Sequence, residues 1–245
     1  MGACMVTTMP NIDIIYQHPD FLVISKPIAV TMHYADGDIA LLPLLIQNGF
    51  TDLSLVHRLD TDTSGLMILA RNRNATVSFA TLFEQRKIEK YYIAISDNKP
   101  AKKQGHILGD MKKVRNGSYA LTRENTNPAY TQFFSRSLNI ESAKPHRLFV
   151  LKPFTGKTHQ LRVALKSLGA PIVGDKRYSK TQSDRMYLHA WGIRFEYLGE
   201  HFQFIHAPTD GELFNSRCFK QSLAELPEPW NYAWPDSKQP GRRND

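Results

Sequence analysis

The sequence has few cysteines and no long apolar run. Only Cys4 and Cys218 occur among 245 residues, which is too few for a disulfide framework and lacks the spacing of zinc ligands. This scarcity favours a reducing, cytoplasmic setting. The apolar stretch at residues 39–46 contains Pro43 and is far shorter than the roughly 20 residues that a membrane helix needs. The first ten residues show no secretory signal, so we expect neither a membrane span nor a metal site.

Acidic residues are scarce in one part of the chain. The net charge is +8, and residues 102–180 hold 16 Lys and Arg against 4 Asp and Glu, whereas the other residues hold 15 against 19. A basic block beside a mildly acidic remainder is the electrostatic pattern of a polyanion-binding protein. A solvated, lysine-rich surface would give the same counts. We expect a nucleic-acid partner in preference to that plainer interpretation.

The chain shows no internal repeat and no Gly/Ser-rich linker, which favours a single domain. We expect this domain to span residues 12–235, after an N-terminal extension at 1–11 and before a disordered tail at 236–245. In the last part of the domain, Trp230, Tyr232 and Trp234 are candidates to anchor the chain. Hydrophobic patterning predicts short strands at 12–16, 21–25, 53–56, 66–70, 91–95, 131–135, 147–151, 186–189, 192–197 and 202–206.

The same patterning predicts three helices and one exposed excursion. A short buried helix is expected at 39–47, and a second helix at 74–88, with Asn74 as N-cap and an apolar stripe of Val77, Ala80 and Phe83. A third helix is expected at 158–168, ending at Gly169. Residues 97–127 are basic and weakly periodic, which suits an exposed, hairpin-like excursion.

The segment His57-Arg58-Leu59-Asp60-Thr61-Asp62-Thr63-Ser64-Gly65 is unusual for a connection between two apolar strands. It holds one His, one Arg, two Asp and three hydroxyl residues in nine positions. Asp and Thr side chains often bond to neighbouring backbone N–H groups in turns, which accounts for much of this pattern. It accounts less well for an Arg two residues before an Asp. From these residues alone, a structural loop and a functional loop both stay open.

This segment resembles the HRLDxxTSG signature of the RluA-type pseudouridine synthases. The resemblance runs from about residue 12 to residue 208, in the order and spacing of that family. Further matching segments are Lys26-Pro27 with His33, Lys90 with Tyr92 and Ala94, Gly156 to Arg162, Gly174-Asp175 with Tyr178, Leu188-His189-Ala190, and Ala207-Pro208.

The departures from the family pattern are few. Ala29 stands where the family usually has Gly, so we expect that turn not to use a positive φ. Lys157 replaces Arg, Leu161 replaces Ile, and Ser179 stands where Gly is common. None of these changes touches the position of the family's catalytic aspartate.

The resemblance implies a mixed α/β (α+β) fold, with a central, largely antiparallel sheet flanked by helices and a cleft across its middle. It also implies isomerisation of uridine to pseudouridine in tRNA or ribosomal RNA, without cofactor or metal. We expect a monomeric catalytic domain that has no S4-like RNA-binding domain in front of it. The target uridine would be flipped out of the RNA stack, because its reacting atoms are out of reach in a helix.

The resemblance also implies roles for individual residues. Asp60 occupies the position of the catalytic aspartate, which acts either as nucleophile at C1′ or as base at C2′. Arg162 would pair with it in a bidentate manner, and Tyr92 would stack on the uracil. Residues on the substrate side would be Leu161 as an apolar wall, Arg58 in the space left by the flipped base, and His57, Thr63 and Gln160. Candidates for contact with the RNA backbone are Lys102, Lys103, Lys112, Lys113 and Arg115.

Other interpretations have less support. Gly156-Lys157-Thr158 looks like the end of a phosphate-binding P-loop, but the position for its first glycine is Leu151. A glycoside hydrolase needs two carboxylates about 5–10 Å apart, and no second motif supports Asp62 in that role. The alternative from a different class is a non-catalytic RNA-binding or assembly factor that retains the fold. A carboxylate held against RNA phosphates would serve no purpose in such a factor.

Overall fold

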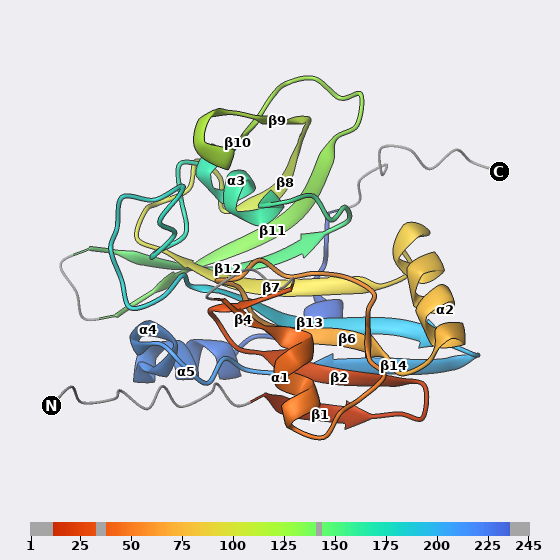
Figure 1. The fold of residues 1–245 in the computed structure, drawn as a ribbon. Coiled ribbons are helices and arrows are strands. Elements are labelled where there is room, and N and C mark those ends of the chain that lie inside the picture. The colour runs from red at the N-terminus through yellow and green to blue at the C-terminus, as the bar shows by residue number, and fades with distance from the viewer. Residues whose placement is uncertain (1–11, 33–37, 141–143, 236–245) are drawn as a thin grey trace, which may run out of the picture.

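The computed structural model describes residues 12–32, 38–140 and 144–235. The expected extension at 1–11, the expected tail at 236–245 and His33 lie outside the described residues. Within them, a large sheet runs through the molecule, and helices pack on it (Figure 1). This arrangement confirms the expected mixed fold with a largely antiparallel sheet.

The main sheet has ten strands, and its path begins at β1 and β2, where the sequence predicts strands at 12–16 and 21–25. Every pairing within it is antiparallel except the one between β13 and β6. β14 (Glu200–Ile205) pairs with β13, and β5 (Ser54–Leu55) pairs with β6. The order along the path is β1 (Asp13–Gln17), β2 (Phe21–Lys26), β6 (Ser64–Ala70), β13 (Leu188–Tyr197), β7 (Glu89–Ser96), β12 (His146–Pro153), β11 (Ala129–Leu138) and β8 (Gln104–Gly109).

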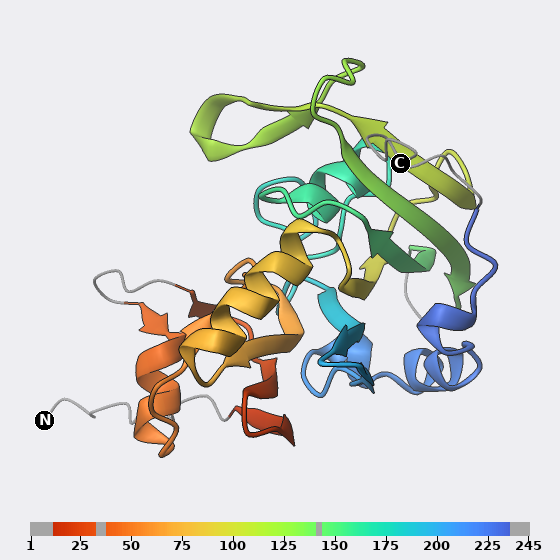
Figure 2. The ribbon, with the colours of Figure 1, turned by 90° about the vertical axis from the view of Figure 1, so that its right-hand side faces the viewer.

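Helices cover the sheet at three places, and Figure 2 shows α2 and α1 from the side. Apolar residues of α1, α3, α4 and α5 join one core cluster with the sheet, and those of α2 join a second cluster rich in phenylalanine. The helices are α1 (Leu41–Gln47), α2 (Arg73–Glu84), α3 (Gln160–Ser167), α4 (Glu212–Asn215) and α5 (Arg217–Ala224), with two 3-10 turns, η1 (Arg115–Gly117) and η2 (Pro229–Asn231).

The expected details of α2 are wrong in two respects. Asn72, not Asn74, is the N-cap, because its extended backbone lets its side chain accept a hydrogen bond from the Ala75 amide at 2.8 Å. A helix that starts there turns Ala75 and Phe79 toward the core. Val77 is therefore exposed, and the expected stripe through Val77 is not the buried face.

Two other expectations about the strands need correction. The basic excursion does contain a hairpin, β9 (Met111–Lys113) with β10 (Tyr119–Leu121), but β8 within the same segment joins the main sheet beside β11. The strands expected at 186–189 and 192–197 form one strand, β13, because an irregularity between Ala190 and Gly192 changes its register without ending it.

Ala29 has a φ of 60°, so the expectation that this turn avoids a positive φ is wrong. The turn keeps its left-handed geometry although the side chain carries a Cβ, which disfavours that region. It connects β2 with β3 (Val30–Thr31), which pairs with β4 (Ile39–Ala40). The aromatic residues near the C-terminus do anchor that part of the chain, since Tyr232 and Trp234 both pack on Phe134.

Candidate active site

The loop between β5 and β6 carries Asp60 and is held firmly at several points. The Thr63 amide donates a hydrogen bond to the Asp60 carbonyl at 3.0 Å, and Leu59 is buried in the core. Beneath the loop, the fully buried Lys26 ammonium donates to the Thr61 carbonyl at 3.1 Å and to two nearer carbonyls. Burial lowers the pKa of Lys26 to about 7, a cost that these bonds partly offset.

After the loop, β6 approaches β13 so closely that Gly65 is required. Its φ is 110°, and a Cβ there would lie 2.4 Å from the Ala190 carbonyl oxygen. Just before it, the Ser64 hydroxyl lies 2.8 Å from Nδ1 of His189, and Arg185 donates to the same hydroxyl at 2.6 Å. Burial lowers the pKa of His189 to about 3, so its ring is neutral at pH 7. This network fixes the C-terminal end of the loop to the centre of the sheet.

The guanidinium of Arg162, in the first turn of α3, lies between two carboxylates. Its Nε and Nη2 donate to the two oxygens of Asp175, each at 2.8 Å, and its Nη1 donates to Oδ2 of Asp60 at 3.3 Å. The expected pair between Arg162 and Asp60 is therefore present, but its expected bidentate form is wrong. The bidentate partner is Asp175, and Asp60 takes the one remaining corner of the guanidinium.

The electrostatics of this triad follow from its burial. The Asp175 side chain is fully buried, the Arg162 side chain is 7% exposed, and that of Asp60 is 20% exposed. Burial lowers the pKa of Arg162, but the charges of Asp175 and Asp60 outweigh it and raise that pKa above its ordinary value. Arg162 thus stays charged, and it provides a fixed cation beside the more exposed carboxylate.

Asp175 is itself held by the turn that the motif Gly174-Asp175 with Tyr178 forms. Its Oδ1 also accepts hydrogen bonds from the amides of Arg177 and Tyr178, at 3.0 and 3.1 Å. Gly174 has a φ of 75°, and a Cβ there would lie 1.8 Å from the Arg185 carbonyl oxygen, so no other residue fits the turn. Although the motif is visible in the sequence, its role in fixing the position of Arg162 could not be inferred without the structure.

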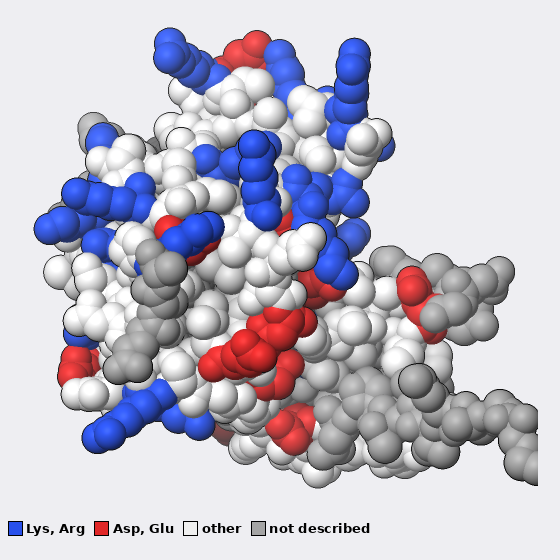
Figure 3. Space-filling view, turned by 90° about the vertical axis from the view of Figure 1, so that its left-hand side faces the viewer, with Lys and Arg blue, Asp and Glu red and all other residues white. Residues whose placement is uncertain are grey.

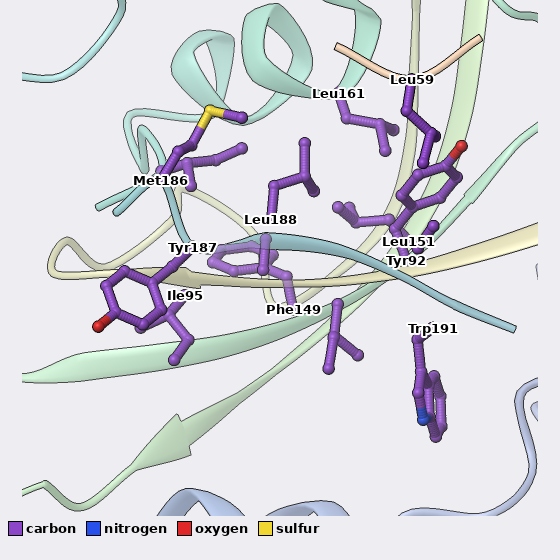
Figure 4. Packing of buried hydrophobic residues seen from close by; sticks show 14 of the residues in the cluster. Leu59, Tyr92, Ile95, Phe149, Leu151, Leu161, Met186, Tyr187, Leu188 and Trp191 are labelled. Carbon is purple, nitrogen blue, oxygen red and sulfur yellow. The ribbon is translucent and has the colours of Figure 1, made fainter. Parts of the chain in front are cut away.

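Asp60 and Arg162 line a cavity that has an apolar wall. Its empty volume is about 570 Å³, and Leu59, Tyr92 and Leu161 line it together with them. Figure 4 shows the Tyr92 ring beneath Leu59 and Leu161. Burial and the charge of Asp60 raise the pKa of Tyr92, so its hydroxyl stays protonated. A flat ring and a charged pair that line one small cavity suit a planar, polar ligand.

The other substrate-side candidates divide into two groups. Arg58 and Thr63 line the cavity; Arg58 is exposed and forms no ion pair with a described residue. Gln160 also lines it, but its amide makes four hydrogen bonds, to Thr155, Lys157, Tyr130 and Thr131. His57 lies outside the cavity lining. Its Nε2 accepts from the Ile68 amide, and burial lowers its pKa to about 3, so it supports the loop.

The basic candidates lie at two separate places. Lys112, Lys113 and Arg115 belong to the β9–β10 hairpin and its turn, whereas Lys102 and Lys103 precede β8. The hairpin borders the active site, because Asn116 and Ser118 line one hollow with Asp60 and Arg162. Lys and Arg gather over the upper part of the face in Figure 3, and most carboxylates lie lower.

The hairpin is tied to the active site by Tyr178. Its hydroxyl accepts from the Tyr119 amide at 2.8 Å and lies 2.9 Å from Nδ1 of His159. Burial and the charge of Arg162 lower the pKa of His159, which leaves Nδ1 free to accept from Tyr178. The Tyr178 ring also lies 5.2 Å from the Arg162 guanidinium.

Two expected absences concern membranes and metals. No helix in residues 12–32, 38–140 or 144–235 is both long and apolar enough to cross a bilayer. Over the same ranges, no cluster of three or more His, Cys, Asp or Glu side chains is arranged to hold a metal ion.

The two carboxylates of the triad should contribute very differently to stability. We expect Asp175→Asn to lower the free energy of unfolding by about 3–5 kcal/mol, because it removes the buried carboxylate that binds two of the three donor positions of the buried guanidinium. Asp60→Asn should change it by about 1 kcal/mol or less, since Asp60 is partly exposed and makes one longer contact. Urea unfolding of both variants measures the difference. Equal changes in the free energy of unfolding would contradict the assignment of Asp175 as the residue that fixes the position of Arg162.

Comparison of the sequence with known proteins identifies a family. The family model described as RNA pseudouridylate synthase matches residues 20–167. An uncharacterized RNA pseudouridine synthase of Haemophilus influenzae is 44% identical, over 90% of this chain and 98% of that protein. Ribosomal large subunit pseudouridine synthase C of Rickettsia bellii is 32% identical over 74% of this chain, which spans 62% of that longer protein.

Solved structures agree as well. The human protein named RNA Pseudouridylate Synthase Domain Containing 1 superposes with a TM-score of 0.73 at 26% identity, over 89% of this chain and 97% of its own. Human RNA Pseudouridylate Synthase Domain Containing 4 gives a TM-score of 0.64 at 25% identity, over 88% and 95%. The chain therefore belongs to the RNA pseudouridylate synthase family, a family of isomerases that act on RNA.

Proposed function

We propose that this chain isomerises uridine to pseudouridine in RNA with Asp60 as its catalytic carboxylate. The observation that carries this proposal is the position of Asp60, which is held by Arg162 at the edge of a small, partly apolar cavity. Its second oxygen, Oδ1, accepts no hydrogen bond from a described residue and can face a ligand. A carboxylate placed in this way can act on the ribose of a nucleotide whose base enters the cavity.

The reaction needs no external reactant. The N1–C1′ bond of the uridine breaks, the uracil rotates, C5 bonds to C1′, and the proton on C5 leaves as N1 gains one. Asp60 either attacks C1′ and is released again, or removes and returns a proton at C2′. In both routes, Arg162 supports the carboxylate while its charge changes. None of these steps uses a cofactor.

The apolar wall explains how the freed uracil stays in place. Tyr92 offers a flat ring, and Leu59 and Leu161 close the cavity beside it. These contacts have no fixed polar direction, so the base can turn while it stays bound. Arg58, which is exposed and lines the cavity, would occupy the gap that the flipped base leaves in the RNA. Thr63 would line the ribose side, and His57 and Gln160 would support the walls.

Asp60→Asn should lower the rate of isomerisation at least about 100-fold, because it removes the acting carboxylate, and should leave RNA affinity nearly unchanged. Release of tritium from RNA that carries C5-labelled uridine measures the rate. Asp62→Asn is the matched control, since Asp62 lies on the same loop but does not line the cavity. Near-normal activity of Asp60→Asn would refute the assignment of Asp60.

Ribosomal RNA of the large subunit is the substrate that we propose first. The basis is the name of relatives such as ribosomal large subunit pseudouridine synthase C of Rickettsia bellii, together with the basic segment at 102–180. We propose further that residues 12–235 act as one catalytic domain, as a monomer in the cytoplasm. Mapping pseudouridines in total RNA with and without the protein tests the choice between ribosomal RNA and tRNA. If no pseudouridine is lost when the protein is absent, a non-catalytic RNA-binding factor is favoured.

The β9–β10 hairpin should carry more of the RNA affinity than Lys102 and Lys103, because it borders the active site. We expect Lys112→Gln, Lys113→Gln and Arg115→Gln together to flatten the dependence of log affinity on log salt by about 0.7–0.9 for each phosphate that the variant no longer neutralises. Lys112 also pairs with Glu124 at 2.8 Å, so its share should be the smallest. Affinity for RNA at several salt concentrations measures the slope.

The control for this experiment is the pair Lys102→Gln and Lys103→Gln, which removes charge at the other end of β8. The control pair should flatten the slope less than the hairpin variant does. A hairpin variant with the slope of the unchanged protein would show that the RNA backbone does not cross the hairpin.

A further inference from the structure

A second groove continues from the candidate active site, and the proposed function leaves it without a role. Its empty volume is about 1430 Å³, more than twice that of the cavity at Asp60. The turn after α2, the first residues of β7 and the segment that follows β12 form its walls, and Figure 2 shows α2 beside that segment. Both hollows are lined by Arg58, Lys90, Lys157 and residues 153, 155 and 156. The groove is therefore entered directly from the mouth of the cavity.

The groove combines aromatic rings with cations. The half-buried rings of Phe83 and Phe154 line it together with Arg58, Arg86 and Lys90. None of these three cations forms a hydrogen bond or ion pair with a residue in the described part of the chain. The Lys90 ammonium lies 5.6 Å from the centre of the Phe83 ring, and burial lowers its pKa to about 8. An ammonium held half-buried without an anionic partner favours an incoming anion.

Most of the remaining charged residues of the groove already have a partner within the protein. Lys152 pairs with Glu89 at 2.8 Å, and Lys157 donates to the Asn127 carbonyl. Glu84 is the other carboxylate of the lining, at the end of α2. The unpaired cations thus outnumber the unpaired carboxylates, so the groove as a whole attracts a negatively charged ligand.

Contacts of its backbone and of its ring fix the position of Phe154. Its amide donates to the Tyr130 carbonyl at 3.0 Å, and its ring packs on the Tyr130 ring with centres 4.9 Å apart. A ring fixed before binding offers contact area to a ligand at little cost in conformational entropy. Stacking on aromatic rings beside cations is how proteins bind unpaired nucleotides.

We propose that this groove binds the nucleotide next to the target uridine, with its base against Phe154 and its phosphate near Lys90 and Arg58. This inference rests on the proposed function, because the groove and the uridine cavity would then hold consecutive nucleotides of one strand. The RNA would have to be unpaired on that side of the target. The groove thereby selects uridines in loops or at the ends of helices.

The test is a cycle between protein variants and RNAs that lack single bases. The substrate is an RNA fragment around a uridine that mapping identifies, made with an abasic nucleotide on the 5′ side, on the 3′ side, or on neither. With the unchanged protein, one of the two abasic RNAs should show a value of kcat/KM that is lower by about tenfold, the loss expected for one stacked base. With Phe154→Leu, that RNA and the intact RNA should react almost equally.

Phe154→Leu keeps an apolar side chain against Tyr130 but removes the flat ring, and thermal unfolding would show that it folds. Phe204→Leu is the matched control, since Phe204 is also half-buried but lies on β14, outside the groove. That control should keep the full abasic penalty. Lys90→Met should weaken binding of the intact RNA and of the abasic RNA equally, because it acts on the phosphate.

The outcomes separate the two proposals. If the unchanged protein isomerises none of these RNAs, the proposed function fails. If it isomerises them but both abasic RNAs react as well as the intact one, or if Phe154→Leu keeps the abasic penalty, the groove proposal fails and the proposed function stands.

Discussion

One guanidinium shared by two carboxylates determines the geometry of the candidate active site. Arg162 donates hydrogen bonds from two of its nitrogen atoms to the buried Asp175 and from the third to Asp60. A planar guanidinium fixed on two sides has no freedom to rotate, so the position of its remaining corner is determined. Asp60 is thereby held beside a cation without being enclosed. A carboxylate that is both oriented and accessible is what the proposed chemistry requires.

The rest of the fold brings the members of this triad together from distant parts of the chain. Asp60 lies in the loop before β6, Arg162 on α3, and Asp175 in the turn after that helix. Strand pairing at the centre of the sheet joins β6 to β13 and β13 to β7, which places the Asp60 loop over the strand that carries Tyr92. Close approaches at Gly65 and Gly174 leave these segments no room to shift.

Much of this site could be predicted from the sequence, but the bonds between Arg162 and Asp175 that hold it from behind could not. The order of the family motifs identified Asp60, Arg162, Tyr92 and Leu161, and the structure places all four around one cavity. The bidentate partner of Arg162 was predicted wrongly, because spacing along the chain does not show which of two carboxylates lies deeper. The buried carboxylate takes the two best-aligned bonds, since a buried charge without partners is the costlier arrangement.

The fold, like the site, could be predicted from the sequence only in part. The pattern of short apolar runs predicted most of the strands, because central strands such as β2 and β6 are buried on both faces. It missed β8 as a sheet strand, since an edge strand with Gly105 and Gly109 carries little apolar pattern. It also misjudged the buried face of α2, because the cap at Asn72 sets where the helix begins. The groove beside α2 is formed by separate segments, and no single stretch of sequence reveals it.

The most direct test of the central interaction is the single-turnover rate of Arg162→Lys at saturating RNA. Lysine keeps the charge but cannot hold Asp175 with two donors while a third reaches Asp60. If the planar guanidinium of Arg162 positions Asp60, the rate should fall roughly 100-fold, as expected for a catalytic group displaced by about 1 Å. RNA affinity should change little. A rate equal to that of the unchanged protein would show that positive charge alone suffices, and would contradict the account.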